Sequence, residues 1–243
     1  MRRIAFLAFS FLFFAQTAAA NTSWSMISFT TTPQNAPVVL AAADKLMQSA
    51  AGKTFPGRLH LQASLVDGAN PATHSFVPIY ASAKEREDFA VKLQADPAWG
   101  EFMETMSSTT QPVATTLHRT LKSWGMPDDS DRVWMAYAFS VRDPAAFRAA
   151  VDQLMASPTG KKFPGQVHLS SIVAGGLSPV SHVISVGYQS EAEMEAWEEM
   201  RDASADWAAY LQASRPAADF LGASLARDLK IWGPASLKDL AEN

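Results

Sequence analysis

Four of the five histidines form two pairs with the same spacing. His60 and His74 lie 14 residues apart, and so do His168 and His182. Two imidazoles brought close together can bind Zn, Cu or Fe, can contact an organic ligand, or can make hydrogen bonds within the fold. The chain has no Cys, and no helical His-x-x-x-His pattern supplies further ligands. We therefore expect no metal site, and structural bonding and ligand contact stay open as alternatives.

A turn lies between the two histidines of each pair. The midpoint of His60 and His74 is Asp67, in the turn-forming segment 67–71, and the midpoint of His168 and His182 is Gly175, in the segment 175–179. Residues equidistant from a hairpin turn lie opposite each other and share a face. We therefore predict that each pair faces the space between two sheets, and that these four histidines are candidate ligand-binding residues.

Two arginines are further candidates. Arg119 and Arg227 alternate with leucines in strand-like segments, so each is expected to share a face with apolar residues. An Arg in that setting needs an anionic ligand or a carboxylate partner such as Glu85 or Glu193, and both alternatives stay open. The fifth histidine, His118, has Ala226 as its counterpart in the second copy described next and is expected to be an ordinary edge or rim histidine.

These candidates recur because the chain is a tandem duplication. The segment Lys53-Thr54-Phe55-Pro56-Gly57 returns 108 residues later as Lys161-Lys162-Phe163-Pro164-Gly165. The same offset relates further pairs of identical residues: Tyr80 and Tyr188, Trp99 and Trp207, Arg119 and Arg227, Trp124 and Trp232. One unit of about a hundred residues is therefore the object to explain.

Each copy predicts the order strand, helix, strand, strand, helix, strand. The expected strands lie near residues 24–30, 58–66, 73–80 and 117–121, and near 134–141, 166–174, 181–188 and 225–229. Asn35 and Asp143 are the expected N-caps of the first helix in each copy. Ser82 with Glu85, and Ser190 with Glu193, form the pattern of a capping box at the second helix. In the first copy Asp96-Pro97 is expected to kink or restart the second helix.

This order is that of a ferredoxin-like βαββαβ unit, in which helices cover one face of an antiparallel sheet. A second copy can cover the other face, so the fold class expected is α+β, with two tandem repeats packed as a pseudo-dimeric α/β barrel. With Asp96-Pro97-Ala98-Trp99 in the second helix, the chain resembles fused units of the dimeric α/β-barrel superfamily. That superfamily includes antibiotic-biosynthesis monooxygenases, haem-degrading monooxygenases, chlorite-dismutase-like proteins and the NIPSNAP family. The resemblance implies the fold and leaves the reaction open.

The N-terminus has the pattern of an export signal. Arg2 and Arg3 precede an apolar run and then Ala18-Ala19-Ala20. We expect a signal peptide at residues 1–20, cleavage after Ala20, and a periplasmic or secreted protein. A twin-arginine signal is a less favoured alternative. The other expected boundaries are repeat 1 at 21–125, a linker at 126–133, repeat 2 at 134–233 and a tail at 234–243.

Charge and motifs exclude several functions. Loss of Arg2 and Arg3 would change the formal charge from −4 to −6, because residues 1–20 hold no Asp or Glu. An acidic chain without basic blocks argues against nucleic acid and, after cleavage, against an anionic membrane. No nucleophile motif or phosphate-binding glycine loop is present.

The function expected from these observations is that of an exported small-molecule-binding protein, with a cavity between two sheets and internal two-fold pseudo-symmetry. It is expected to be a monomer. The cofactor, if any, stays open. The alternatives are an oxidative enzyme, haem-dependent or cofactor-free, and a structural or interaction module without a ligand.

Overall fold

The computed structural model describes residues 22–125, 130–175 and 179–233. Repeat 1 contains β1 (Ser23–Thr31), α1 (Ala36–Gln48), β2 (Arg58–Val66), β3 (His74–Tyr80), α2 (Ala83–Ala95), α3 (Pro97–Thr109) and β4 (Thr110–Gly125). Repeat 2 contains β5 (Val133–Val141), α4 (Pro144–Ala156), β6 (Gln166–Ala174), β7 (His182–Tyr188), α5 (Glu191–Asp202), α6 (Ala205–Ser214) and β8 (Ala218–Trp232). Short 3-10 turns, Gly52–Thr54 and Gly160–Lys162, precede β2 and β6. The two repeats thus have the same order of elements, as the sequence predicts.

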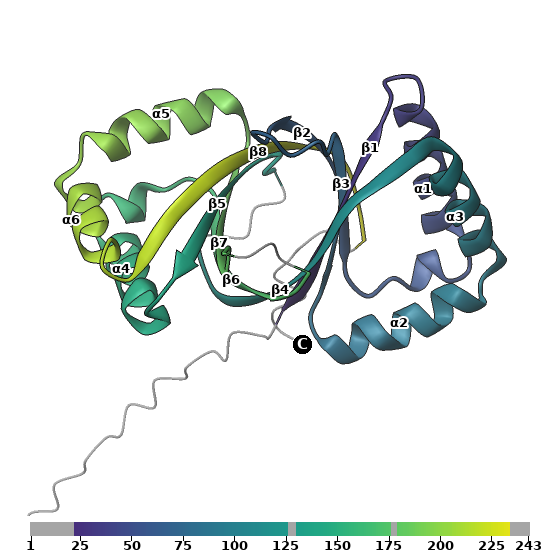
Figure 1. Cartoon of the computed structure of the whole chain (residues 1–243), viewed down its shortest axis with the longest axis horizontal. Helices are drawn as coiled ribbons and strands as arrows, with labels where there is room; N and C mark the ends of the chain where they lie inside the picture. The colour runs from purple at the N-terminus through teal and green to yellow at the C-terminus, as the bar shows by residue number, and fades with distance from the viewer. Residues whose placement is uncertain (1–21, 126–129, 176–178, 234–243) are drawn as a thin grey trace, which may run out of the picture.

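All eight strands form one closed antiparallel barrel in the order β1-β3-β2-β8-β5-β7-β6-β4. Each repeat supplies four consecutive strands, and the barrel closes through β2 with β8 and β4 with β6. Figure 1 looks along the barrel, with α1 to α3 packed on one side and α4 to α6 on the other. The predicted α+β fold, a pseudo-dimeric barrel of two ferredoxin-like units, is confirmed.

Local capping signals fix most helix starts. Asp143 accepts hydrogen bonds from the backbone N–H groups of Ala145 and Ala146, and Asp96 accepts one from Ala98, so α3 restarts at Pro97. Ser82 and Ser190 cap α2 and α5. Asn35 is the N-cap residue of α1, as predicted, but its side chain makes no capping hydrogen bond and its amide donates instead to the carbonyl oxygen of Thr109.

Successive side chains along each strand alternate between two environments, the helix side and the barrel interior. Leu61 on β2 and Leu169 on β6 are 1% exposed and pack under the helices with Phe29 and Phe147. The residues on either side of Leu61 along β2, His60 and Gln62, point into the barrel. The apolar core is therefore outside the barrel, and the barrel interior can hold polar groups.

Each repeat is also tied to the first helix of the other. Trp124 and Lys122 at the end of β4 bond to Asp152 on α4, with Trp124 Nε1 donating at 3.1 Å. In the same way Trp232 Nε1 at the end of β8 donates at 2.8 Å to Asp44 on α1, which also pairs with Lys230. These two inter-repeat clasps are symmetric, and both are partly buried. They fix the ends of the strands that cross between repeats.

The predicted signal peptide at 1–20, the tail at 234–243 and residues 126–129 of the predicted linker lie outside the described residues. Within the described part, no helix is both long and apolar enough to span a bilayer.

Candidate functional site

The histidine pairs do not face each other. In the β2–β3 hairpin His60 lies opposite Val77 and His74 lies opposite Ala63. In the β6–β7 hairpin His168 lies opposite Ser185 and His182 opposite Ser171. The centre of the first hairpin therefore lies between residues 68 and 69 and not at Asp67. The pairing differs from the predicted one by three residues, an odd number, and an odd shift moves one member of each pair to the opposite face.

The two outer histidines, His74 and His182, lie on the helix-facing side of the sheet. Each bonds through Nδ1 to the hydroxyl of the preceding residue, Thr73 at 3.0 Å or Ser181 at 2.9 Å. Burial lowers the pKa of both imidazoles. Neither lines the barrel cavity described next, so the prediction of four histidines in one cavity is wrong for these two.

The barrel interior contains a cavity of about 200 Å³. His60 and His168, one from each repeat, are the predicted residues that line it. Most of its wall is apolar or aromatic, and the side chains that define its character are Trp24, Met26, Val77, Ile79 and Trp134, with Gln62 among the polar ones. The cavity has room for a small organic molecule.

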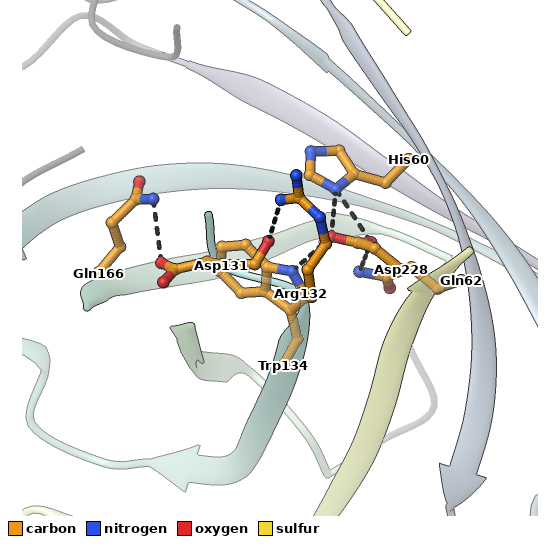
Figure 2. A network of polar contacts seen from close by, with 7 residues as sticks. All are labelled: His60, Gln62, Asp131, Arg132, Trp134, Gln166 and Asp228. Carbon is orange, nitrogen blue, oxygen red and sulfur yellow. Dashed lines mark hydrogen bonds and ion pairs between the residues drawn. The ribbon is translucent and has the colours of Figure 1, made fainter. Parts of the chain in front are cut away.

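His60 is held by a buried carboxylate from the other repeat (Figure 2). Its Nδ1 lies 3.0 and 3.1 Å from the two carboxylate oxygens of Asp228, and the Asp228 side chain is 1% exposed. Gln62 Nε2 and Trp134 Nε1 donate to the same carboxylate at 3.0 and 2.9 Å. A carboxylate surrounded by donors accepts only, so Nδ1 of His60 is the protonated nitrogen. In the neutral imidazole Nε2 therefore carries a lone pair.

The free nitrogen of His60 is the notable feature of this network. His60 is 2% exposed and lines the cavity, and its Nε2 is buried without a hydrogen-bond partner within the described residues. Buried polar atoms are rarely left unbonded, and exceptions often mark a place where a ligand or substrate binds. Nε2 of His60 is thus the best candidate reactive atom of the cavity.

Three neighbouring strands bring this network together. β8 lies between β2 and β5, with Gln62 opposite Asp228 and Trp134 opposite Ala226. A bulge follows Leu61 in the β2–β8 pairing and brings His60 alongside Asp228. Because β2 belongs to repeat 1 and β5 and β8 to repeat 2, neither repeat can build the site alone.

A second set of polar groups borders Trp134 (Figure 2). Gln166 Nε2 donates to the buried carboxylate of Asp131 at 3.1 Å, and Arg132 Nη1 donates to the backbone oxygen of Asp131 at 2.7 Å. Gly187 makes this packing possible. A Cβ there would lie 2.5 Å from an Asp131 oxygen and 3.0 Å from the Trp134 ring.

His168 lines the same cavity without a carboxylate. Its Nδ1 lies 2.8 Å from the hydroxyl of Ser123, and its ring is stacked on Trp134 with centroids 6.2 Å apart. Burial, with a smaller electrostatic effect from His60, lowers the pKa of His168 to about 4. His168 is therefore neutral at neutral pH.

His118 packs inside the barrel against Trp24, a residue of the cavity wall. It is 3% exposed and stacks on Trp24 with centroids 3.7 Å apart and rings nearly parallel. Its Nε2 bonds to Thr116, and burial lowers its pKa to about 4. Trp24 in turn donates to Ser170 Oγ at 3.2 Å. The prediction of an edge histidine is wrong, because this imidazole packs inside the barrel and fixes the ring of Trp24.

The two candidate arginines lie outside the cavity. Arg119 is exposed, and the Arg227 side chain is 49% exposed and pairs with Glu191 on α5. Neither lines the cavity. Arg227 has a carboxylate partner, which was one of the two alternatives, and that partner is Glu191 and not Glu85 or Glu193. Both face the helix side of the barrel because they alternate with inward-pointing neighbours.

Asp228 is the residue that sequence reasoning missed. It directly follows Arg227, so the expectation that Arg227 could contact a ligand in the cavity placed Asp228 on the opposite face by strand alternation. Its counterpart in repeat 1 is Thr120, so the repeat comparison could have marked it as a carboxylate present in one copy only. Among the described residues no group of three or more His, Asp or Glu is arranged to hold a metal ion.

Comparisons with known proteins give similarity in structure alone. The sequence matches no protein-family model, and a search of curated proteins finds no match. A "putative monooxygenase" from Fusobacterium nucleatum has a TM-score of 0.62 at 11% identity, over 90% of this chain and 97% of that chain. A "putative monooxygenase" from Lactobacillus acidophilus has a TM-score of 0.60 at 12% identity, over 89% and 98%. An "anthrone oxidase-like protein" has a TM-score of 0.56 at 11% identity, over 89% and 94%.

At these identities the shared property is the fold, so the resemblance to the dimeric α/β-barrel superfamily is confirmed at that level. The function preferred from the sequence, an exported small-molecule-binding protein, needs correction. The similar structures are described as monooxygenases and as anthrone oxidase-like, and these descriptions favour the oxidative enzyme that was the alternative.

Proposed function

We propose that the protein is a cofactor-free oxygenase that acts on a small, electron-rich phenol inside the barrel. The observation that carries the proposal is the His60–Asp228 pair, with Nε2 of His60 buried, facing an aromatic cavity and without a hydrogen-bond partner in the described part of the chain. The oxygenase descriptions of similarly folded structures support the class of reaction.

The chemistry of the pair is that of a general base. Nε2 of His60 removes the phenolic proton, and the buried carboxylate of Asp228 stabilises the imidazolium that forms. A phenolate is a much better electron donor than a phenol, so it can pass one electron to O2. The resulting superoxide and phenoxyl radical combine at a ring carbon, and His60 returns its proton to the peroxide.

The balance needs no external reductant. The peroxide loses water as the ring carbon loses its hydrogen, so that a phenol and O2 give a quinone and H2O. The substrate supplies all the electrons, two oxygen atoms enter, and one leaves as water. The apolar walls formed by Trp24, Met26 and Ile79 suit both an aromatic ring and O2.

Haem, which the superfamily resemblance also allows, does not fit this cavity. A His whose Nδ1 is held by a carboxylate is a suitable axial ligand, and His60 meets that condition. The cavity, however, is too small for haem. Sites for drug-sized ligands span roughly 300–1,000 Å³, whereas this cavity is about 200 Å³. A porphyrin is larger than most such ligands, so the reaction proposed here does not use haem.

Oxygen uptake tests the proposal. Purified protein is mixed with a panel of one-ring and two-ring phenols and hydroquinones in an oxygen electrode, with and without a metal chelator. We expect one O2 consumed per quinone formed, unaffected by the chelator and lost in His60→Gln. His182→Gln is the control, because that imidazole lies outside the cavity. Absence of uptake with every panel member, or a stoichiometric Soret band in the purified protein, would overturn the proposal.

We also propose that this reaction takes place in the periplasm or outside the cell, in a monomer that does not bind membranes. The signal-like residues 1–20 and the acidic mature chain support this location. The fused repeats already provide the second half of the barrel, which removes the need for a partner. Fractionation and light scattering test the location and the monomeric state.

A further inference from the structure

The two histidines of the cavity are equivalent by sequence but have different partners. His60 bonds to a carboxylate, Asp228, whereas the residue at the corresponding position relative to His168 is Thr120. His168 bonds instead to the hydroxyl of Ser123, 2.8 Å from Nδ1. A carboxylate favours the imidazolium, and a hydroxyl without charge does not. The duplicated site has therefore become asymmetric, with one histidine suited to accept a proton and one suited to stay neutral.

We propose that His168 is a second catalytic residue, which donates a hydrogen bond from Nε2–H to the substrate anion that His60 creates. This inference rests on the proposed function above. A neutral imidazole has one N–H, and the Ser123 hydroxyl can either donate to Nδ1 of His168 or accept from it. The proposed role requires the tautomer in which the hydroxyl donates. When the Ser123 hydroxyl donates to Nδ1, the proton of His168 is on Nε2.

The position of His168 fits this role. Both imidazoles line the same cavity and both contact Trp134, His60 at its edge with centroids 6.1 Å apart and His168 stacked at 6.2 Å. An aromatic substrate bound next to Trp134 would therefore meet both. A donor that stays neutral stabilises a developing anion without competing for its proton, which is how a neutral histidine acts as an electrophile in other enzymes.

The role of His168 can be measured without oxygen chemistry, with 4-nitrophenol as the probe. Its anion spreads negative charge over the oxygens at both ends of the ring, so a donor at either end stabilises it. 4-Nitroanisole has nearly the same shape and cannot ionise. Affinities for both compounds, measured without oxygen at a pH where free nitrophenol is ionised, separate anion stabilisation from packing.

Two substitutions at His168 give opposite expectations. His168→Phe keeps an aromatic ring stacked on Trp134 but removes the donor, and we expect nitrophenolate to bind about 10- to 100-fold more weakly, with nitroanisole unchanged. His168→Gln keeps a side-chain N–H and should recover most of the affinity. His182→Phe is the matched control, because His182 also bonds through Nδ1 to a serine hydroxyl but faces the helices. Its affinities should equal those of the wild type.

Equal nitrophenolate affinity in wild type and His168→Phe would overturn the inference, and so would an equal loss for nitroanisole, which would show a packing role. The proposed function fails separately. If the nitrophenolate results hold while no phenol supports oxygen uptake, the assignment of His168 stands and the oxygenase proposal falls. If oxygen uptake is present and His168→Phe keeps both its kcat and its nitrophenolate affinity, only the His168 assignment falls.

Discussion

Replacement of His118 by Phe should make the fold less sensitive to acid. His118 is 3% exposed and burial lowers its pKa from 6.5 to about 4. The unfolded chain therefore takes up a proton at this residue before the folded chain does. The stability that the neutral imidazole provides is complete above pH 6.5, and it is lost as the pH falls from 6.5 towards 4.

The size of the effect follows from the two pKa values. Between pH 7 and pH 5 the wild type should lose about 2 kcal/mol of unfolding free energy through His118 alone. Phe cannot titrate and can keep the parallel stack on Trp24, which has a centroid separation of 3.7 Å. Other groups, including His168, titrate in both proteins, so their contributions cancel when the two pH dependences are compared.

The assay is urea unfolding of wild type and His118→Phe at pH 7 and at pH 5. The wild type should lose about 2 kcal/mol more than the variant over this range. His118→Gln, which also cannot titrate but breaks the stack, should lose the same pH dependence even if its stability at pH 7 is lower. Identical pH dependence in wild type and both variants would refute the reasoning, because burial would then not keep His118 neutral.

Three further predictions concern the site, the inter-repeat clasps and the N-terminus. Asp228→Asn places an amide against the Nδ1–H of His60, so the rate of oxygen uptake should fall about 10³-fold or more. The same variant should lose about 1–3 kcal/mol of unfolding free energy, and an unchanged uptake rate in the oxygen electrode would contradict a base held by this carboxylate. Asp44→Ala breaks an inter-repeat clasp and should lower the unfolding free energy measured in urea by about 1–2 kcal/mol. Asp88→Ala removes an exposed ion pair and should lower it by less than about 0.5 kcal/mol. Mass spectrometry of the exported protein should find Asn21 as the first residue, and an intact N-terminus would exclude the predicted cleavage.

Signals that act over a few residues could be predicted from the sequence. Asp143 caps α4, and Ser82 and Ser190 cap their helices, because cap and N–H groups are at most three residues apart. The repeat itself fixed the order of elements in both halves. Asn35 is the exception, since a carbonyl 74 residues away attracts its amide.

The register of the two hairpins could not be predicted from the sequence. The expected pairing of His60 with His74 assumed a turn centred on Asp67, and a small displacement of that centre was enough to put the two imidazoles on opposite faces. Spacing alone could not supply the position of the turn, because β2 and β3 are also held in place by β8 and β1 on their other edges.

The sequence by itself determined the duplication, the order of strands and helices, the capping of most helices and the presence of His60 and His168 on strands. The tertiary structure decided which residues form a site. Asp228 reaches His60 across 168 residues of chain, because the barrel closes through β2 and β8. Closure of the barrel is a property of two packed repeats, and no local pattern records which side chains it brings into contact.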